Sequence, residues 1–141
     1  MKFLRYILNE VRTQARADEF LDRVGRNKRF RSEHDPDALH TMTAKFEKMP
    51  QLPAGHEWYF HGKETVSLKS IKTNQQYIGP KSRISKIVAK LLKNPEDHRA
   101  LGYMHPNGTT YLHDGNHTMG AHRAADIKNV HLDVYKARRI E

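Results

Sequence analysis

The spacing of apolar residues changes twice between positions 110 and 135, and the change predicts a strand, a helix and a second strand. The Thr-Tyr-Leu run at 110–112 favours a strand, and Asp-Gly-Asn at 114–116 is strong turn chemistry because Gly and Asn tolerate positive φ. An alanine-rich segment from His117 to Ala125 predicts a helix. From Val130 to Tyr135, apolar and polar residues alternate as they do in a half-buried strand.

Apolar residues at helical spacing also predict two further helices. Between residues 3 and 24 they indicate an N-terminal helix that breaks near 15–18, or two short helices, ending at Gly25. Over residues 84–93 they form a clean stripe, which comprises Ile84, Ile87, Val88, Leu91 and Leu92. The segment Pro106-Asn107-Gly108 predicts a hairpin between strands at 100–105 and 109–112.

Residues 32–62 contain several Pro and Gly residues and resemble a linker. A short helix is expected at about 37–48, with Asp35 as its cap and Pro36 at its first position. The aromatic run 58–60 is read as a strand or a lid, and core packing is favoured over base stacking. Three parts are therefore expected: a basic amphipathic helical extension (1–31), a linker (32–62) and an α+β domain (63–141).

The turn at 114–118 has the local chemistry of a phosphate-binding site. A helix presents N–H groups without intrahelical partners at its start, where its dipole is also positive. Gly115, Asn116, His117 and Thr118 are therefore the candidate phosphate-binding residues. His117 is the candidate catalytic group, as a donor to a phosphoryl oxygen or a general acid or base. Asp114 either caps the turn or takes part in catalysis by holding Mg²⁺ against a nucleotide.

The order of these elements resembles the ParB/sulfiredoxin superfamily. The Asp-Gly-Asn-His turn at 114–117 is similar to the family motif, residues 65–71 to its first strand, 74–83 to its polar loop ending in Arg, and 84–93 to its first helix. The resemblance covers residues 65–138 and implies a small mixed sheet with a phosphate-binding strand-turn-helix. The Arg that usually follows the motif His is Thr118 here, so Arg83 or Arg123 is expected to supply the positive charge.

The charge balance favours an anionic partner. Lys and Arg number 25 against 16 Asp and Glu, which gives a formal charge of +9. The expected nucleic-acid contacts are Arg26, Lys28, Arg29, Arg31, Lys86 and Lys90. The N-terminal helix either packs on the domain or docks a nucleic acid or protein partner.

Other residue types narrow the chemistry. There are no cysteines, so disulfides, thiolate zinc sites and the sulfiredoxin reaction are excluded, and a cytoplasmic location in a bacterial cell or phage-infected host is expected. No signal peptide or membrane span is predicted. The chain has ten histidines, but their spacing between 105 and 131 matches no zinc pattern, so Asp114 is the one metal-ligand candidate.

Three functions are compatible with this sequence. The resemblance and the charge favour a DNA-associated ParB-like nuclease or NTPase that uses a nucleoside triphosphate and Mg²⁺, of the kind found in phages and mobile elements. The second is a non-catalytic DNA- or protein-binding module. The third is a small-molecule phosphotransferase resembling the free-serine kinase branch, for which Glu57 or Glu64 would be the upstream carboxylate.

Overall fold

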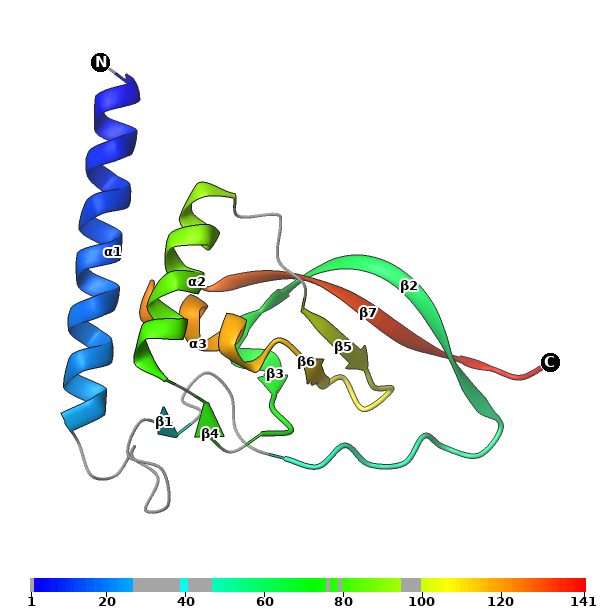
Figure 1. The fold of residues 1–141 in the computed structure, drawn as a ribbon. Helices are drawn as coiled ribbons and strands as arrows, with labels where there is room; N and C mark the ends of the chain where they lie inside the picture. The colour runs from blue at the N-terminus through cyan, green and yellow to red at the C-terminus, as the bar shows by residue number, and fades with distance from the viewer. Residues whose placement is uncertain (1, 27–38, 41–46, 76, 79, 95–99) are drawn as a thin grey trace.

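The described part of the chain is an α+β fold with a five-stranded mixed sheet and three α-helices (Figure 1). The computed structural model describes residues 2–26, 39–40, 47–75, 77–78, 80–94 and 100–141. The helices are α1 (Lys2–Arg26), α2 (Lys81–Lys93) and α3 (Asn116–Ala124). α3 packs on the sheet, and α1 and α2 pack on α3. They gather at one side of the molecule, and two long strands extend away from them towards the C-terminus (Figure 1). The predicted fold class is confirmed.

The sheet has the strand order β2-β7-β5-β6-β3. Its strands are β2 (His56–Ser67), β3 (Ile71–Lys72), β5 (Leu101–Met104), β6 (Thr110–Asp114) and β7 (Asn129–Arg139). β2 and β7 are antiparallel, β7 and β5 parallel, β5 and β6 antiparallel, and β6 and β3 parallel. The hairpin predicted around residues 106–108 is confirmed as β5–β6, because His105 N–H donates to the carbonyl of Thr109 at 2.9 Å.

The strand predicted at 65–71 is wrong at both ends. β2 begins at His56, so residues 58–60 belong to a strand rather than to a lid. β2 ends at Ser67, where a 3₁₀ turn, η2 (Leu68–Ser70), changes the chain direction before β3. The apolar and β-branched residues of 65–71 are typical of a strand. However, Leu68 and Ile71 are both buried, and residues three positions apart in a strand project to opposite faces, so one continuous strand would not bury both on the same face.

Two buried clusters hold the helices and the sheet together. The first lies between the helices and comprises Ala17, Leu21, Val24, Ile84, Val88, Leu91, Ala121 and Ala124. The second lies on the sheet and comprises Val66, Leu68, Ile71, Ala100, Leu112, Met119, Val130, Leu132 and Val134. α3 contributes to both clusters, so it connects the helical layer to the sheet. The apolar stripe predicted on α2 is confirmed.

α1 is one continuous helix, so the predicted break near residues 15–18 is wrong. Ala17 is fully buried at this point, and Asp18 accepts a hydrogen bond from the hydroxyl of Ser85 on α2. Asp18 therefore contacts α2 and does not interrupt the helix. No helix in the described parts of the chain has the length and apolar character needed to cross a membrane.

The helix predicted at 37–48 is also wrong at the residues of this range that the structure describes, 39–40 and 47–48. Leu39–His40 forms strand β1, which pairs with β4 (Tyr77–Ile78), and residues 47–48 are not helical. The proposed caps at 35 and 36 lie outside the described residues. The division into extension, linker and domain stays a prediction.

Candidate functional site

The predicted strand-turn-helix is formed by β6, Gly115 and α3. β6 ends at Asp114, and Gly115 occupies the N-cap of α3 with φ 105°, in the left-handed region. Its N–H donates to Oδ1 of Asp114 at 2.9 Å, and its carbonyl accepts the first helical bond from Met119 N–H at 2.9 Å. A residue with a Cβ is strained at this φ, so glycine sets the angle at which the chain enters the helix.

Asn116 anchors the turn to the loop that follows β3. Its side chain is 7 % exposed and accepts a hydrogen bond from the Thr73 hydroxyl. Its Nδ2 donates to Oδ1 of Asn74 at 3.2 Å and to Oε1 of Gln75 at 3.3 Å. Asn74 also donates from Nδ2 to the carbonyl of His113 at 3.4 Å. The amide of Asn116 is thus used for structure, so any contact of Asn116 with an anion would be through its backbone.

The remaining residues of the turn lie closer to the surface. Asp114 is exposed, and Gly115, His117 and Thr118 are half-buried. Asp114 and His117 therefore lie on either side of Gly115 and Asn116 at the start of α3. The carbonyl of Thr118 accepts a 2.7 Å bond from Nδ1 of His122, one turn further along α3.

The turn can hold an anion better than it can hold a metal by itself. The first turn of α3 has no acidic residue, and the positive end of the helix dipole lies there. Among the residues that the structure describes, no three His, Asp or Glu side chains are grouped closely enough to hold a metal ion. Asp114 could supply one oxygen to Mg²⁺, with phosphate and water oxygens as the other ligands.

Of the two arginines expected to supply charge, Arg123 lies at the far end of α3 from the turn. Arg123 is in the last turn of α3, seven residues and about 10 Å beyond Asn116. There it lines a hollow of about 350 Å³, together with Lys69, His122, Asp126 and Lys128. Arg83 is exposed in the first turn of α2. Within the described residues, no hydrogen bond or ion pair connects either arginine to residues 114–118.

The expected nucleic-acid contacts are placed only in part. Arg26 is exposed at the end of α1, and Lys86 and Lys90 are exposed on α2. These three residues are exposed cations on the helices, and their contact with nucleic acid stays a prediction. Lys28, Arg29 and Arg31 lie outside the described residues.

The two glutamates considered for phosphotransfer lie at the opposite edge of the sheet from β3. Both are on β2, where Glu57 pairs with Arg138 at 3.0 Å and Glu64 pairs with Lys136 at 2.5 Å. Three strand spacings, about 14 Å, separate β2 from β6. Neither carboxylate is therefore brought to the turn.

Sequence reasoning missed three features around this site. Thr73 is a buried polar residue whose role depends on a contact 43 residues away. The aromatic residues of β2, β5 and β7 contact one another across the sheet. In the sequence, only the aromatic residues at the alternating positions 58 and 60 indicate such a surface. A hollow of about 410 Å³, lined by Lys63, Glu64, Thr65 and His131, left no recognisable sequence pattern.

No protein-family model matches the chain, and no curated protein matches it in sequence. The geometry of the turn and the chemistry of its residues therefore carry the functional argument.

Proposed function

We propose that this protein binds the phosphate of a nucleotide or nucleic acid at residues 114–118. The observation that carries the proposal is the left-handed Gly115 at the N-cap of α3, which begins the helix directly after Asp114. Helix starts of this kind bind phosphate through backbone N–H groups and the helix dipole. The anchoring of Asn116 to the loop 73–75 supports a turn that is rigid before the ligand arrives.

The residues of the turn fit a nucleoside triphosphate with Mg²⁺. In this proposal the backbone of residues 116–118 binds the phosphate, and the second carboxylate oxygen of Asp114 coordinates the metal, which would neutralise phosphate charge. His117, half-buried in the first turn of α3, donates to a phosphoryl oxygen or exchanges a proton with the attacking water. Hydrolysis of a nucleotide or of nucleic acid is the activity that these groups support.

The anionic partner is proposed to be DNA-associated because of the charge of the chain. A formal charge of +9 favours binding to polyphosphates, and the resemblance to ParB-like domains points to a nuclease or NTPase. The non-catalytic alternative keeps the same phosphate site without the proton transfer at His117. The two differ in the effect of His117→Ala, which abolishes hydrolysis in the first and leaves an inactive binder unchanged in the second.

The test is calorimetric titration of ATP, CTP, GTP and ADP, with and without Mg²⁺, into the wild type and two Gly115 variants. Gly115→Val cannot adopt the left-handed φ without strain, whereas Asn is the residue that tolerates it best after Gly. We expect Gly115→Val to lose nucleotide binding and Gly115→Asn to keep most of it. A ligand at about a hundred times its Kd would also raise the stability of the wild type by about 2.7 kcal/mol.

A gain-of-function variant makes the test independent of folding defects. Thr118 occupies the position where the resembled family carries Arg, and its side chain is half-buried. Thr118→Arg adds a guanidinium at the helix start and should tighten phosphate binding, while Thr118→Gln adds length without charge and should not. If no nucleotide binds the wild type and Thr118→Arg gains nothing, the turn is not a phosphate site.

A further inference from the structure

The sheet face opposite the helices carries a row of aromatic rings that crosses four adjacent strands. Residues directly opposite each other in neighbouring strands project to the same face. Tyr135 of β7 lies opposite Phe60 of β2 and Tyr103 of β5, and Tyr103 lies opposite Tyr111 of β6. These four residues, Phe60, Tyr135, Tyr103 and Tyr111, are called the aromatic row below. Val134, the neighbour of Tyr135, projects to the other face and is buried in the core with Met119.

Three rings of the aromatic row, Phe60, Tyr135 and Tyr103, contact one another in order. Tyr103 and Tyr135 are stacked with centroids 5.2 Å apart and an interplanar angle of 18°. Phe60 meets Tyr135 edge-on at 5.4 Å, and Trp58, on the same face of β2, meets Tyr103 at 5.1 Å. His113 continues the surface on β6, with its ring 5.6 Å from Tyr103, and is followed directly by the turn at 114–118.

The row is buried at one end and open at the other. Tyr111 is buried, and its hydroxyl accepts a bond from Nδ2 of Asn107 at 3.0 Å. Tyr103 and Tyr135 are half-buried, whereas the Phe60 side chain is 58 % exposed in the middle of β2. A large aromatic ring that is mostly exposed beside other rings contributes little to the core, and it is suited to stacking with a planar ligand.

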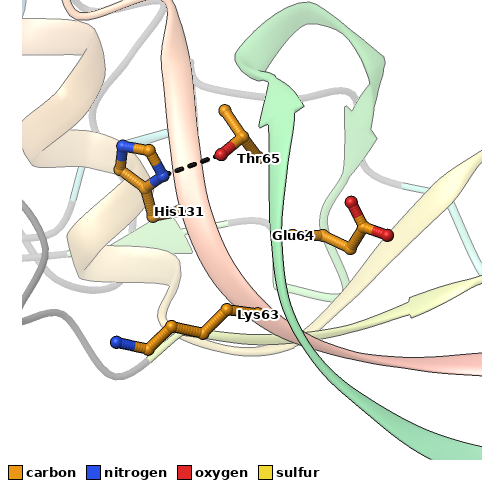
Figure 2. Close-up of a pocket in the computed structure, with 4 residues that line it drawn as sticks. All are labelled: Lys63, Glu64, Thr65 and His131. Carbon is orange, nitrogen blue, oxygen red and sulfur yellow. Dashed lines mark hydrogen bonds between the residues drawn. The ribbon is translucent and has the colours of Figure 1, made fainter.

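Cations and a hollow lie along the same face. Lys63 and Arg139 project from it, and both are exposed, while Asp133 opposite Lys63 is the acidic residue on this face of β7. Figure 2 shows Lys63 and His131 projecting to one side of the β2–β7 ribbon and Glu64 to the other. Thr65 Oγ1 and His131 Nδ1 are hydrogen-bonded at 2.8 Å at the end of this hollow of about 410 Å³.

From these observations we infer that the aromatic row and the adjoining hollow bind single-stranded nucleic acid. Bases stack on exposed aromatic rings of a sheet without regard to sequence, and the backbone follows neighbouring cations. His131 beside the hollow and Tyr135 in the aromatic row are four residues apart on β7, a distance of about 13 Å. An extended single-stranded nucleic acid covers this distance with roughly two nucleotides. Duplex DNA is excluded because its bases are not free to stack on the row. This inference does not rest on the phosphate proposal, since it uses different residues.

The test is fluorescence anisotropy with labelled single strands of about twelve nucleotides, oligo(dT) and oligo(U), and with a duplex of equal length. We expect both single strands to bind more tightly than the duplex. The difference in affinity between oligo(dT) and oligo(U) shows whether the sugar matters. Phe60→Ala should weaken binding about tenfold or more, because one stacking ring is lost. Phe60→Leu should weaken it to a similar extent, because Leu keeps apolar area but has no flat face, and Phe60→Trp should retain it.

Three controls keep the outcome decisive. Val11→Ala alters a side chain of comparable exposure, 61 %, on α1 and should change nothing. Lys63→Ala should weaken binding of all sequences and reduce the slope of log affinity against log salt by about one. Phe60→Ala should weaken single-strand binding by the same factor in the Gly115→Val background as in the wild type, which separates the two sites.

The inference is overturned by any of three results: no single-strand binding at about 50 mM salt, equal binding of duplex, or equal affinity in Phe60→Ala and wild type. Sedimentation velocity covers the remaining occupant of this face, a second copy of the chain. If the wild type self-associates, Phe60→Ala is monomeric and oligonucleotide affinity is unchanged, the row is an interface between copies and the inference fails.

Discussion

Thr73 and Asn116 are 43 residues apart in the chain and are joined by a buried hydrogen bond, in which the Thr73 hydroxyl donates to the Asn116 side-chain carbonyl. Thr73 is 1 % exposed and Asn116 is 7 % exposed, so water does not replace the bond easily. The Thr73 oxygen also accepts the N–H of Gln75 at 3.2 Å. This contact fixes the loop after β3 against the start of α3.

We expect Thr73→Val to destabilise the protein by about 1–3 kcal/mol. Val has nearly the shape of Thr but has no hydroxyl, so the Asn116 carbonyl and the Gln75 N–H lose their partner inside the protein. Thr73→Ser keeps the hydroxyl and is the matched control, with a smaller loss from the missing methyl group. Urea unfolding measures the difference, and equal stability of the Val and Ser variants would contradict the role of the hydroxyl.

Gly102 is packed so closely that a methyl group does not fit. An added Cβ would lie 3.0 Å from Cδ1 of Leu132, 3.3 Å from Cγ2 of Thr110 and 3.3 Å from the carbonyl oxygen of Tyr111. Leu132 is almost fully buried and cannot move aside freely. We expect Gly102→Ala to cost about 1–3 kcal/mol in thermal or urea unfolding.

The control for Gly102 is Gly108 in the same hairpin. Gly108 has φ 86° and no atom within 4 Å of an added Cβ, so the backbone angle is its one constraint. Gly108→Asn places a residue that tolerates this angle in open space, and we expect a change within about 0.5 kcal/mol. A larger loss at Gly108 than at Gly102 would contradict the packing argument.

The elements with a clear local signal could be predicted from the sequence. The turn chemistry at 114–116, the alternation at 130–135 and the stripe on α2 each depend on neighbours along the chain, and the corresponding β6, α3, β7 and α2 are present. The helix start that carries the candidate site could be predicted for the same reason, because a helix start after Asp-Gly is a local feature.

What the sequence could not provide depends on contacts between distant residues. The β2 strand begins at His56 because it pairs with β7 down to Arg139, and no local pattern marks that length. Arg123 lies in the last turn of α3, and its distance from the helix start depends on the length of that helix; its part in phosphate binding stays a prediction. The contact of Phe60, Tyr103 and Tyr135 across the sheet can be predicted only when the strand order is known. The alternation of apolar and polar residues along each strand does not specify that order.

Two apolar residues of α1, Leu21 and Val11, should respond differently to mutation. Leu21 is buried in the helical cluster, whereas Val11, three turns earlier, is 61 % exposed. We expect Leu21→Ala to lose about 2–5 kcal/mol of stability and Val11→Ala to change it by less than about 0.5 kcal/mol. Circular dichroism during urea unfolding measures both. Equal and small effects would mean that α1 is an independent extension and not part of the core.

Glu64 lies in a small network on the β2–β7 ribbon. Its Oε1 accepts a bond from Nζ of Lys136 at 2.5 Å and one from Nε2 of His61 at 3.2 Å. The hydrogen bond from Lys136 is the main cause that lowers the pKa of Glu64 below its ordinary value, with a smaller contribution from His61 and partial opposition from burial. The ionised carboxylate is therefore favoured in the folded protein.

A lowered pKa in the folded state means that Glu64 adds stability above its unfolded pKa and that this contribution is lost as pH falls through the folded value. Lys136→Met removes the main cause, so we expect the pKa of Glu64 to rise towards its ordinary value and the acid-dependent loss of stability to shrink. Carbon-detected NMR titration of the glutamate carboxyl measures the pKa, and urea unfolding across the acid range measures the stability. His61→Gln should raise the pKa less than Lys136→Met does, and Lys63→Met, whose charge is not among the causes of the shift, serves as the control. A pKa of Glu64 that is the same in Lys136→Met and wild type would show that this lysine does not hold the carboxylate in its ionised form.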